Sequence, residues 1–230
     1  MDRYSKNEKT LSPEENLSLR TKRVCIAGCG GLGGYITEML GRLGVGYITL
    51  VDGDVFEESN LNRQLYSAPS LIGTSKAKAA GDRLRFINPE VTVQTINEYM
   101  DQDNARQIIK GHDVVVDALD RKAPRLLLET ACAELKIPLV HGAIGGWYGQ
   151  VAVILPGRNL LHEIYGGMGE QGIETGLGNP AFTPAMVAAF QVSETIKLLI
   201  GKPSDLTNQI MFIDMLNLDL TVINKNQDRS

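Results

Sequence analysis

The chain alternates short apolar runs with segments of helical periodicity from residue 22 to residue 143. The short runs predict strands, and the longer stretches with apolar residues on one face predict helices. The predicted strands span 24–27, 47–51, 91–96, 114–117 and 138–143. The predicted helices span 32–43, 75–86 and 124–135, and a further short helix is expected to be capped by Asp101 or Asp103 and to end at Ile109. This repeated alternation indicates a parallel sheet that helices cover on both faces.

The pattern changes after residue 144. A Gly145-Gly146 turn precedes a predicted strand at 151–155, and a predicted helix at 184–200 precedes strands at 210–213 and 218–222. Between them, 157–184 is glycine-rich with almost no apolar periodicity, so we expect an irregular segment that is functional or mobile. We therefore predict one α/β domain over 1–230, with a Rossmann-like, mostly parallel sheet and antiparallel strands in its C-terminal part. Its nucleotide-binding half spans 22–143 and its second half spans 144–230.

A glycine-rich loop lies between the first predicted strand and helix. Gly28, Gly30 and Gly33 have the Gly-x-Gly-x-x-Gly spacing, and Gly31 lies in the same loop. Such a loop lets a phosphate approach the backbone and meet the free N–H groups of the helix. Asp52 ends the next strand, where a carboxylate can accept hydrogen bonds from ribose hydroxyls. These residues predict a nucleotide site, and alone they favour a nicotinamide-dependent dehydrogenase.

The residues that follow Asp52 favour a more highly charged nucleotide. The next segment and the start of the following helix supply five polar residues: the amides Asn60 and Asn62, the cations Arg63 and Lys76, and the supporting Gln64. A solvated loop and a surface lysine are the simpler interpretation. Their position at the carboxyl side of the sheet, where ligands of such folds bind, favours contact with phosphates instead.

Two aspartates follow a later strand, in the segment Val114-Val-Val-Asp117-Ala-Leu-Asp120. Carboxylates at a strand end can hold Mg²⁺ that bridges phosphate oxygens. The alternative is a cap for the helix at 124–135, and the two roles are compatible.

Composition excludes several classes of function. The chain has 230 residues and a net charge of −4, which disfavours nucleic acid or an anionic membrane as the main partner. No apolar stretch approaches a membrane span, and the N-terminus lacks the apolar core of a signal peptide, so we expect a cytoplasmic protein. Cys25, Cys29 and Cys132 do not have the spacing of a zinc site, and none of them predicts a disulfide framework.

Taken together, these residues resemble the ThiF/MoeB/HesA family, the prokaryotic relatives of ubiquitin-activating enzymes. The likeness runs from Arg3-Tyr4-Ser5 through the glycine loop, Asp52–Gln64, Asn88-Pro89 and the late helix. It implies ATP- and Mg²⁺-dependent adenylation of the C-terminal glycine of a small ubiquitin-like sulfur-carrier protein, with release of pyrophosphate, in sulfur-containing cofactor biosynthesis of the thiamin or molybdopterin type. The enzyme is expected to be a homodimer.

The resemblance also implies residue roles. Asp52 would bind ribose, Asn60, Arg63 and Lys76 would hold the triphosphate with support from Gln64, and Asp120 would coordinate Mg²⁺. The expected catalytic residues are Arg63, Lys76 and Asp120. The expected cofactor-binding residues are Gly28, Gly30, Gly31, Gly33, Asp52, Asp54, Asn60, Arg63, Gln64, Lys76 and Leu119. His141 is interpreted as a strand-end residue and not as a catalyst.

The chain departs from the family pattern at several positions. Where the family sends an N-terminal arginine into the partner subunit's site, this chain offers Lys6 or Arg3. It has no Cys-x-x-Cys pair, so we expect no zinc. It has no cysteine after Cys132, so we expect the reaction to stop at the acyl-adenylate. Asp120 is followed by Arg121 in place of the usual asparagine, which leaves the geometry of a bound metal open.

Segment 157–184 corresponds to the family's crossover loop, under which the carrier's tail would lie; a disordered insertion is the alternative. Three other functions stay open at this point: adenylation of a different carboxylate, such as that of a tRNA base or a peptide, an NAD-dependent oxidoreductase, and an inactive binding partner.

Overall fold

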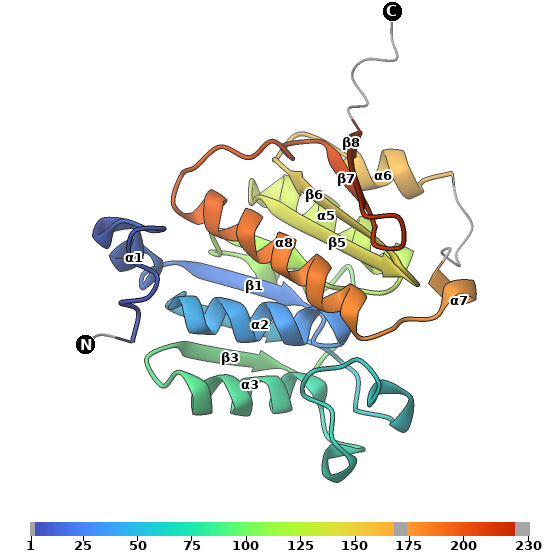
Figure 1. The fold of residues 1–230 in the computed structure, drawn as a ribbon, viewed down its shortest axis with the longest axis horizontal. Coiled ribbons are helices and arrows are strands. Elements are labelled where there is room, and N and C mark those ends of the chain that lie inside the picture. The colour runs from blue at the N-terminus through green and yellow to red at the C-terminus, as the bar shows by residue number, and fades with distance from the viewer. Residues whose placement is uncertain (1–2, 168–173, 224–230) are drawn as a thin grey trace, which may run out of the picture.

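The computed structural model describes residues 3–167 and 174–223. One eight-stranded sheet crosses it in the order β3-β2-β1-β4-β5-β6-β7-β8 (Figure 1). The first five strands are parallel: β1 (Arg23–Ala27), β2 (Tyr47–Val51), β3 (Thr92–Ile96), β4 (Val114–Asp117) and β5 (Leu139–Gly145). The last three are added antiparallel: β6 (Tyr148–Ile154), β7 (Ile210–Asp214) and β8 (Asp219–Ile223). This is the predicted fold class.

Helices cover both faces of the sheet and bury two separate apolar clusters. One face carries α2 (Gly31–Leu43), α3 (Lys76–Ile87) and α8 (Phe182–Leu199), and the other carries α4 (Ala105–Ile109), α5 (Lys122–Leu135) and α6 (Leu160–Tyr165). Two further helices, α1 (Pro13–Leu19) and α7 (Glu174–Leu177), and two 3₁₀ turns, η1 (Glu58–Asn60) and η2 (Pro69–Leu71), complete the described elements. Among the described helices, none is long and apolar enough to cross a membrane.

The strand order places a ligand crevice between β1 and β4. The chain runs outward from β1 through β2 to β3, then returns to add β4 on the other side of β1. At such a point the loops after the two central strands diverge and leave room for a ligand at their carboxyl ends. The loops that begin at Gly28 and Ala118 lie there in close contact, since a Cβ on Gly28 would be 2.5 Å from the carbonyl oxygen of Ala118.

Several boundaries differ from the sequence prediction. Segment 157–184 is not wholly irregular: α6 and α7 lie in it, α8 begins at Phe182, and 168–173 fall outside the described residues. Strand β6 begins at Tyr148, directly after the glycine turn. The short helix α4 begins only at Ala105, so neither Asp101 nor Asp103 is its N-cap; the carboxylate of Asp101 instead accepts the N–H groups of Asp103 and Asn104.

Candidate active site

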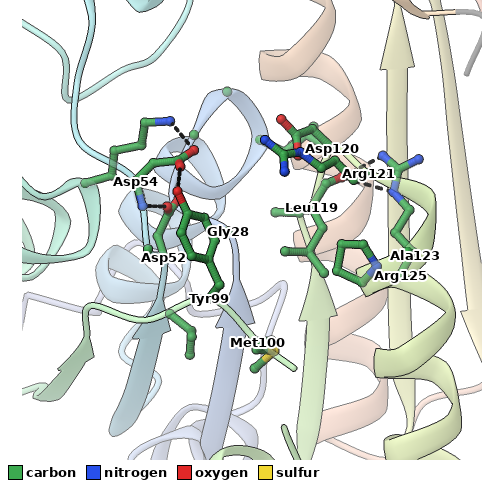
Figure 2. Close-up of a pocket in the computed structure, with 18 of the residues that line it drawn as sticks. Gly28, Asp52, Asp54, Tyr99, Met100, Leu119, Asp120, Arg121, Ala123 and Arg125 are labelled. Atoms are coloured by element: carbon green, nitrogen blue, oxygen red, sulfur yellow. Dashed lines mark hydrogen bonds and ion pairs between the residues drawn. The ribbon is translucent and has the colours of Figure 1, made fainter. Parts of the chain in front are cut away.

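A cavity of about 530 Å³ lies at the carboxyl ends of β1, β2 and β4 (Figure 2). Most of the predicted site residues line it: Gly28, Gly30, Gly31, Asp52, Asp54, Arg63, Gln64, Lys76, Leu119 and Asp120. Segments far apart in the sequence therefore meet at one place, as expected for the carboxyl ends of parallel strands.

The glycine loop forms one wall of the cavity and passes directly into α2. Gly28 has φ +98°, a conformation that favours glycine. Gly30 is the N-cap of α2 and makes no side-chain capping bond, so the first N–H groups of the helix remain available to an anion. Gly33 does not line the cavity; a Cβ there would lie 1.9 Å from the carbonyl oxygen of Gly28. Its role is to let the helix pack against the loop.

Asp52 is held in position by the backbone around it. Its Oδ2 accepts the N–H of Cys29 at 2.7 Å, and its Oδ1 accepts the N–H of Asp54 at 2.8 Å. Burial raises the pKa of this carboxyl above its ordinary value, opposed by these two hydrogen bonds and by the charge of Lys76. The side chain is thus a fixed acceptor on the cavity wall.

Asp54 joins Lys76 to an aromatic residue that the sequence analysis did not single out. The Lys76 ammonium lies 3.0 Å from Asp54 Oδ2, and the Tyr99 hydroxyl donates to Asp54 Oδ1 at 2.5 Å (Figure 2). Burial alone would raise the pKa of Asp54, but Tyr99, Lys76 and the more distant Arg121 lower it overall. Tyr99 lines the cavity beyond the end of β3. In the sequence, only its position as an aromatic residue shortly after a predicted strand could have indicated this role.

The amide and arginine cluster divides into cavity residues and a supporting residue. The guanidinium of Arg63 donates to the carbonyl of Ser59 and to Asn62 Oδ1, and no carboxylate among the described residues pairs with it. Gln64 is 7% exposed, and its Oε1 has no hydrogen-bond partner within the described part of the chain. Asn60 does not line the cavity: it is buried, and its Oδ1 accepts the N–H of Glu57 at 3.0 Å.

The two aspartates after β4 have different positions. Asp120 is exposed and lines the cavity together with Leu119. Asp117 is fully buried and does not line the cavity, so of the two carboxylates only that of Asp120 is available there to a metal. Neither caps the following helix, because the N-cap of α5 is Arg121 and no side chain makes a capping bond there.

Other residues of the cavity wall also escaped the sequence analysis. Arg125 donates from Nε and Nη2 to the carbonyl oxygen of Leu119, at 3.0 and 2.6 Å. Arg121, noted only as a departure from the family pattern, lies on the same wall, and its charge contributes to the lowered pKa of Asp54. The pKa of Tyr99 is raised, mainly by its hydrogen bond to Asp54, and Arg121 opposes this only in part. His141 is not at a strand end; it lies within β5 and is fully buried.

The N-terminal residues lie at the opposite end of the sheet from the cavity. Tyr4 is buried against Gly44, at the C-terminus of α2. Arg3 contacts Asn88 Oδ1 and lies 3.4 Å from Glu90, at the C-terminus of α3. Lys6 is exposed. Neither Arg3 nor Lys6 lines the cavity of its own chain.

The three cysteines are buried and unoxidised. Burial raises the pKa of Cys25 to about 12 and raises those of Cys29 and Cys132 as well. A thiolate is the reactive form of cysteine, so these positions are poor nucleophiles. No group of three or more metal-ligating side chains occurs within the described ranges.

Comparison of the sequence with known proteins identifies the family of this chain. The ThiF family model matches residues 4–230. The SAMP-activating enzyme E1 of Haloferax volcanii is 33% identical over 228 residues, which cover 97% of this chain and 84% of the relative. The molybdopterin-synthase adenylyltransferase of Escherichia coli is 32% identical over 204 residues, 86% of this chain and 81% of the relative.

A solved structure shares the fold as well as the sequence pattern. The E. coli tRNA N6-threonylcarbamoyladenosine dehydratase in complex with ATP has a TM-score of 0.74 and 27% identity, over 86% of this chain and 94% of that chain. The fold, the cavity and the sequence thus agree with one another.

Proposed function

The chain belongs to the ThiF family of adenylyltransferases, and from that premise we propose that it adenylates the C-terminal glycine of a small ubiquitin-like sulfur-carrier protein. ATP is the second substrate and pyrophosphate the leaving group. The observation that carries the proposal is the gathering of Arg63 and Lys76 on the cavity that also holds the glycine loop and Asp52. A dinucleotide needs only the loop and the acid, whereas a triphosphate also needs the cations.

The reaction follows from the charges of its partners. The carrier's terminal carboxylate attacks the α-phosphorus of ATP, an O–P bond forms to the glycine, and the bond to the β-phosphate oxygen breaks. Because the carboxylate is already ionised, no general base is required. Two anions must approach each other, so positioned cations and backbone N–H groups supply most of the catalysis. Arg63, Lys76 and the N-terminus of α2 line the cavity and would supply these charges and N–H groups.

Asp120 fits the role of a magnesium ligand. It is an exposed carboxylate on the cavity wall, and one carboxylate together with phosphate oxygens is an ordinary donor set for Mg²⁺. The metal would neutralise charge on the phosphates. We also propose that the enzyme needs no zinc, and that it works as a homodimer in which Lys6 reaches the partner's cavity, since Arg3 is already held by Asn88 and Glu90.

The proposal is tested by exchange of labelled pyrophosphate into ATP in the presence of candidate carriers that end in Gly-Gly. We expect exchange that depends on the carrier, on Mg²⁺ and on Asp120, with the Asp120→Ala variant inactive but folded. Binding of NAD without ATP would contradict the proposal. Pyrophosphate exchange that depends on a different carboxylate, such as that of a modified tRNA, would show that the substrate is not a carrier protein and is of the kind named for the dehydratase relative.

A further inference from the structure

A buried polar chain connects the Asp120 turn to the second half of the molecule. The Nδ1 of His141, in β5, lies 2.7 Å from Asp117 Oδ2, at the end of β4. The Nε2 on the other side of the ring lies 3.1 Å from the hydroxyl of Tyr165, the last residue of α6. That hydroxyl donates to Gln150 Oε1 in β6 at 3.1 Å. This series of hydrogen bonds thus connects the nucleotide half to the half that follows residue 143.

Asp117 passes this constraint on to the cavity wall. Its Oδ1 accepts the N–H of Leu119 at 2.9 Å, while Arg125 binds the carbonyl oxygen of the same residue. Gln191, in α8, donates to the backbone oxygen of Asp117 at 2.8 Å. Both backbone groups of Leu119 are therefore fixed by buried side chains, and Asp120 is the next residue.

The carboxylate of Asp117 sets the direction of its hydrogen bond with His141. An ionised carboxylate oxygen only accepts, so the Nδ1–H of His141 is the donor. His141 and Asp117 are both fully buried, and Arg125 Nε lies 3.9 Å from Asp117 Oδ2. A buried carboxylate that loses a hydrogen-bond donor is left partly unsatisfied, and the strain falls on the turn that it holds.

We propose that His141 is a positioning residue for adenylation: it orients Asp117, which holds the Leu119–Asp120 turn, and through Tyr165 it ties this turn to α6. The inference rests on the proposed function for its catalytic readout. The hydrogen bonds themselves are measurable in the protein without substrate.

Two substitutions of His141 test its hydrogen bonds with Asp117 and with Tyr165 separately. The amide nitrogen of asparagine can occupy the place of Nδ1, so His141→Asn keeps a donor to Asp117 and loses the contact with Tyr165. The amide of glutamine reaches toward the place of Nε2, so His141→Gln keeps the Tyr165 side and loses the donor to Asp117. Tyr165→Phe removes only the hydroxyl. His112→Gln is the matched control, because His112 binds Thr49 and the Ile109 carbonyl outside the cavity.

The first readout is hydrogen exchange of the Leu119 amide, measured by NMR on the full chain without ligands. We expect the exchange of this amide to be about tenfold faster in His141→Gln than in the wild type or His141→Asn, since a bond to a charged acceptor is lost. The control should not change it. Equal exchange in all variants would overturn the inference, whatever the protein's substrate.

The second readout is pyrophosphate exchange with the carrier. We expect His141→Gln to lower kcat about tenfold with little change in the KM for the carrier, and His141→Asn to recover most of the loss. Tyr165→Phe should give an intermediate kcat. Equal losses in the two His141 variants, matched by equal falls in melting temperature, would assign the residue to folding alone. Failure of the wild type to turn over any carrier would count against the proposed function, and the amide exchange would still decide the hydrogen-bond chain.

Discussion

The ribose-binding role assigned to Asp52 depends on an ionised carboxylate. Burial raises its pKa, so protonation during acidification begins at a higher pH than for an ordinary aspartate. We therefore expect ATP affinity to fall on the acid side, in a step that Asp52→Asn abolishes. The variant itself should bind ATP about 10–100-fold more weakly at neutral pH, because hydrogen bonds to a charged acceptor are lost.

Calorimetric titration of ATP across a pH series measures both effects. Asp82→Asn is a suitable control, since Asp82 is a surface residue of α3 that pairs with Lys78. If Asp52→Asn kept the pH step of the wild type, another group would have to carry it.

Arg121 is a second residue whose contribution can be measured. It lies on the cavity wall, and within the described ranges no carboxylate forms an ion pair with it. We expect Arg121→Ala to raise the KM for ATP about fivefold, which corresponds to about 1 kcal/mol for an exposed charge. Arg42→Ala, which removes an exposed partner of Glu38 in α2, should leave the KM unchanged. Identical KM values in the two variants would remove Arg121 from the site.

Among single residues, the sequence correctly predicted cavity positions for the charged side chains that follow a predicted strand. Asp52, Arg63, Lys76 and Asp120 all line the cavity. Tyr99 and Arg125 were missed because their roles come from tertiary contacts, with Asp54 and with the Leu119 carbonyl. Asn60 was predicted to hold phosphate, but its side chain is already engaged in the local turn.

Among the elements, the junction of β1 and α2 is held by a close approach of backbone to backbone. A methyl group at Gly33 would collide with the backbone of Gly28, which cannot move aside as a side chain can. We expect Gly33→Ala to destabilise the fold by about 1–3 kcal/mol, as overpacking does. Gly167→Ala is the control, because a methyl group added at Gly167 would meet no non-neighbouring atom of the described residues within 4 Å.

Thermal unfolding gives the measurement. Each kcal/mol shifts the melting temperature of a domain of this size by about 2–4 °C, so the Gly33 variant should melt clearly below the wild type. A melting temperature equal to that of Gly167→Ala would mean that α2 can shift away from the loop without loss.

The elements that the sequence predicted well are those with strong local signals, such as β1, β2 and α3. Helix α6 gave no such signal, because its position depends on Glu129 of α5, a residue distant in sequence. The two carboxylate oxygens of Glu129 accept the N–H groups of Leu161 and His162, at 2.7 and 3.1 Å. A buried carboxylate that satisfies the first N–H groups of a helix stabilises it, and a reading of local periodicity cannot detect this contact.

For the whole molecule, the position of Lys6 makes the dimer proposal testable. Lys6 is exposed and far from its own cavity, so it can complete a site only in a second copy. We expect Lys6→Ala and Asp120→Ala each to have little activity alone. Mixed dimers should recover activity, because the Asp120→Ala chain supplies Lys6 to the intact cavity of its partner. Mixing without any gain would show that Lys6 does not act in trans.

The central claim for the molecule is that this cavity adenylates a carrier protein and that the reaction ends there. Intact-mass spectrometry of the chain and a Gly-Gly carrier, incubated with ATP and Mg²⁺, tests it most directly. We predict that the carrier gains the mass of one AMP less one water, and that the chain gains none, because its three cysteines are buried. A carrier left unchanged, or one found covalently attached to the chain, would contradict the account.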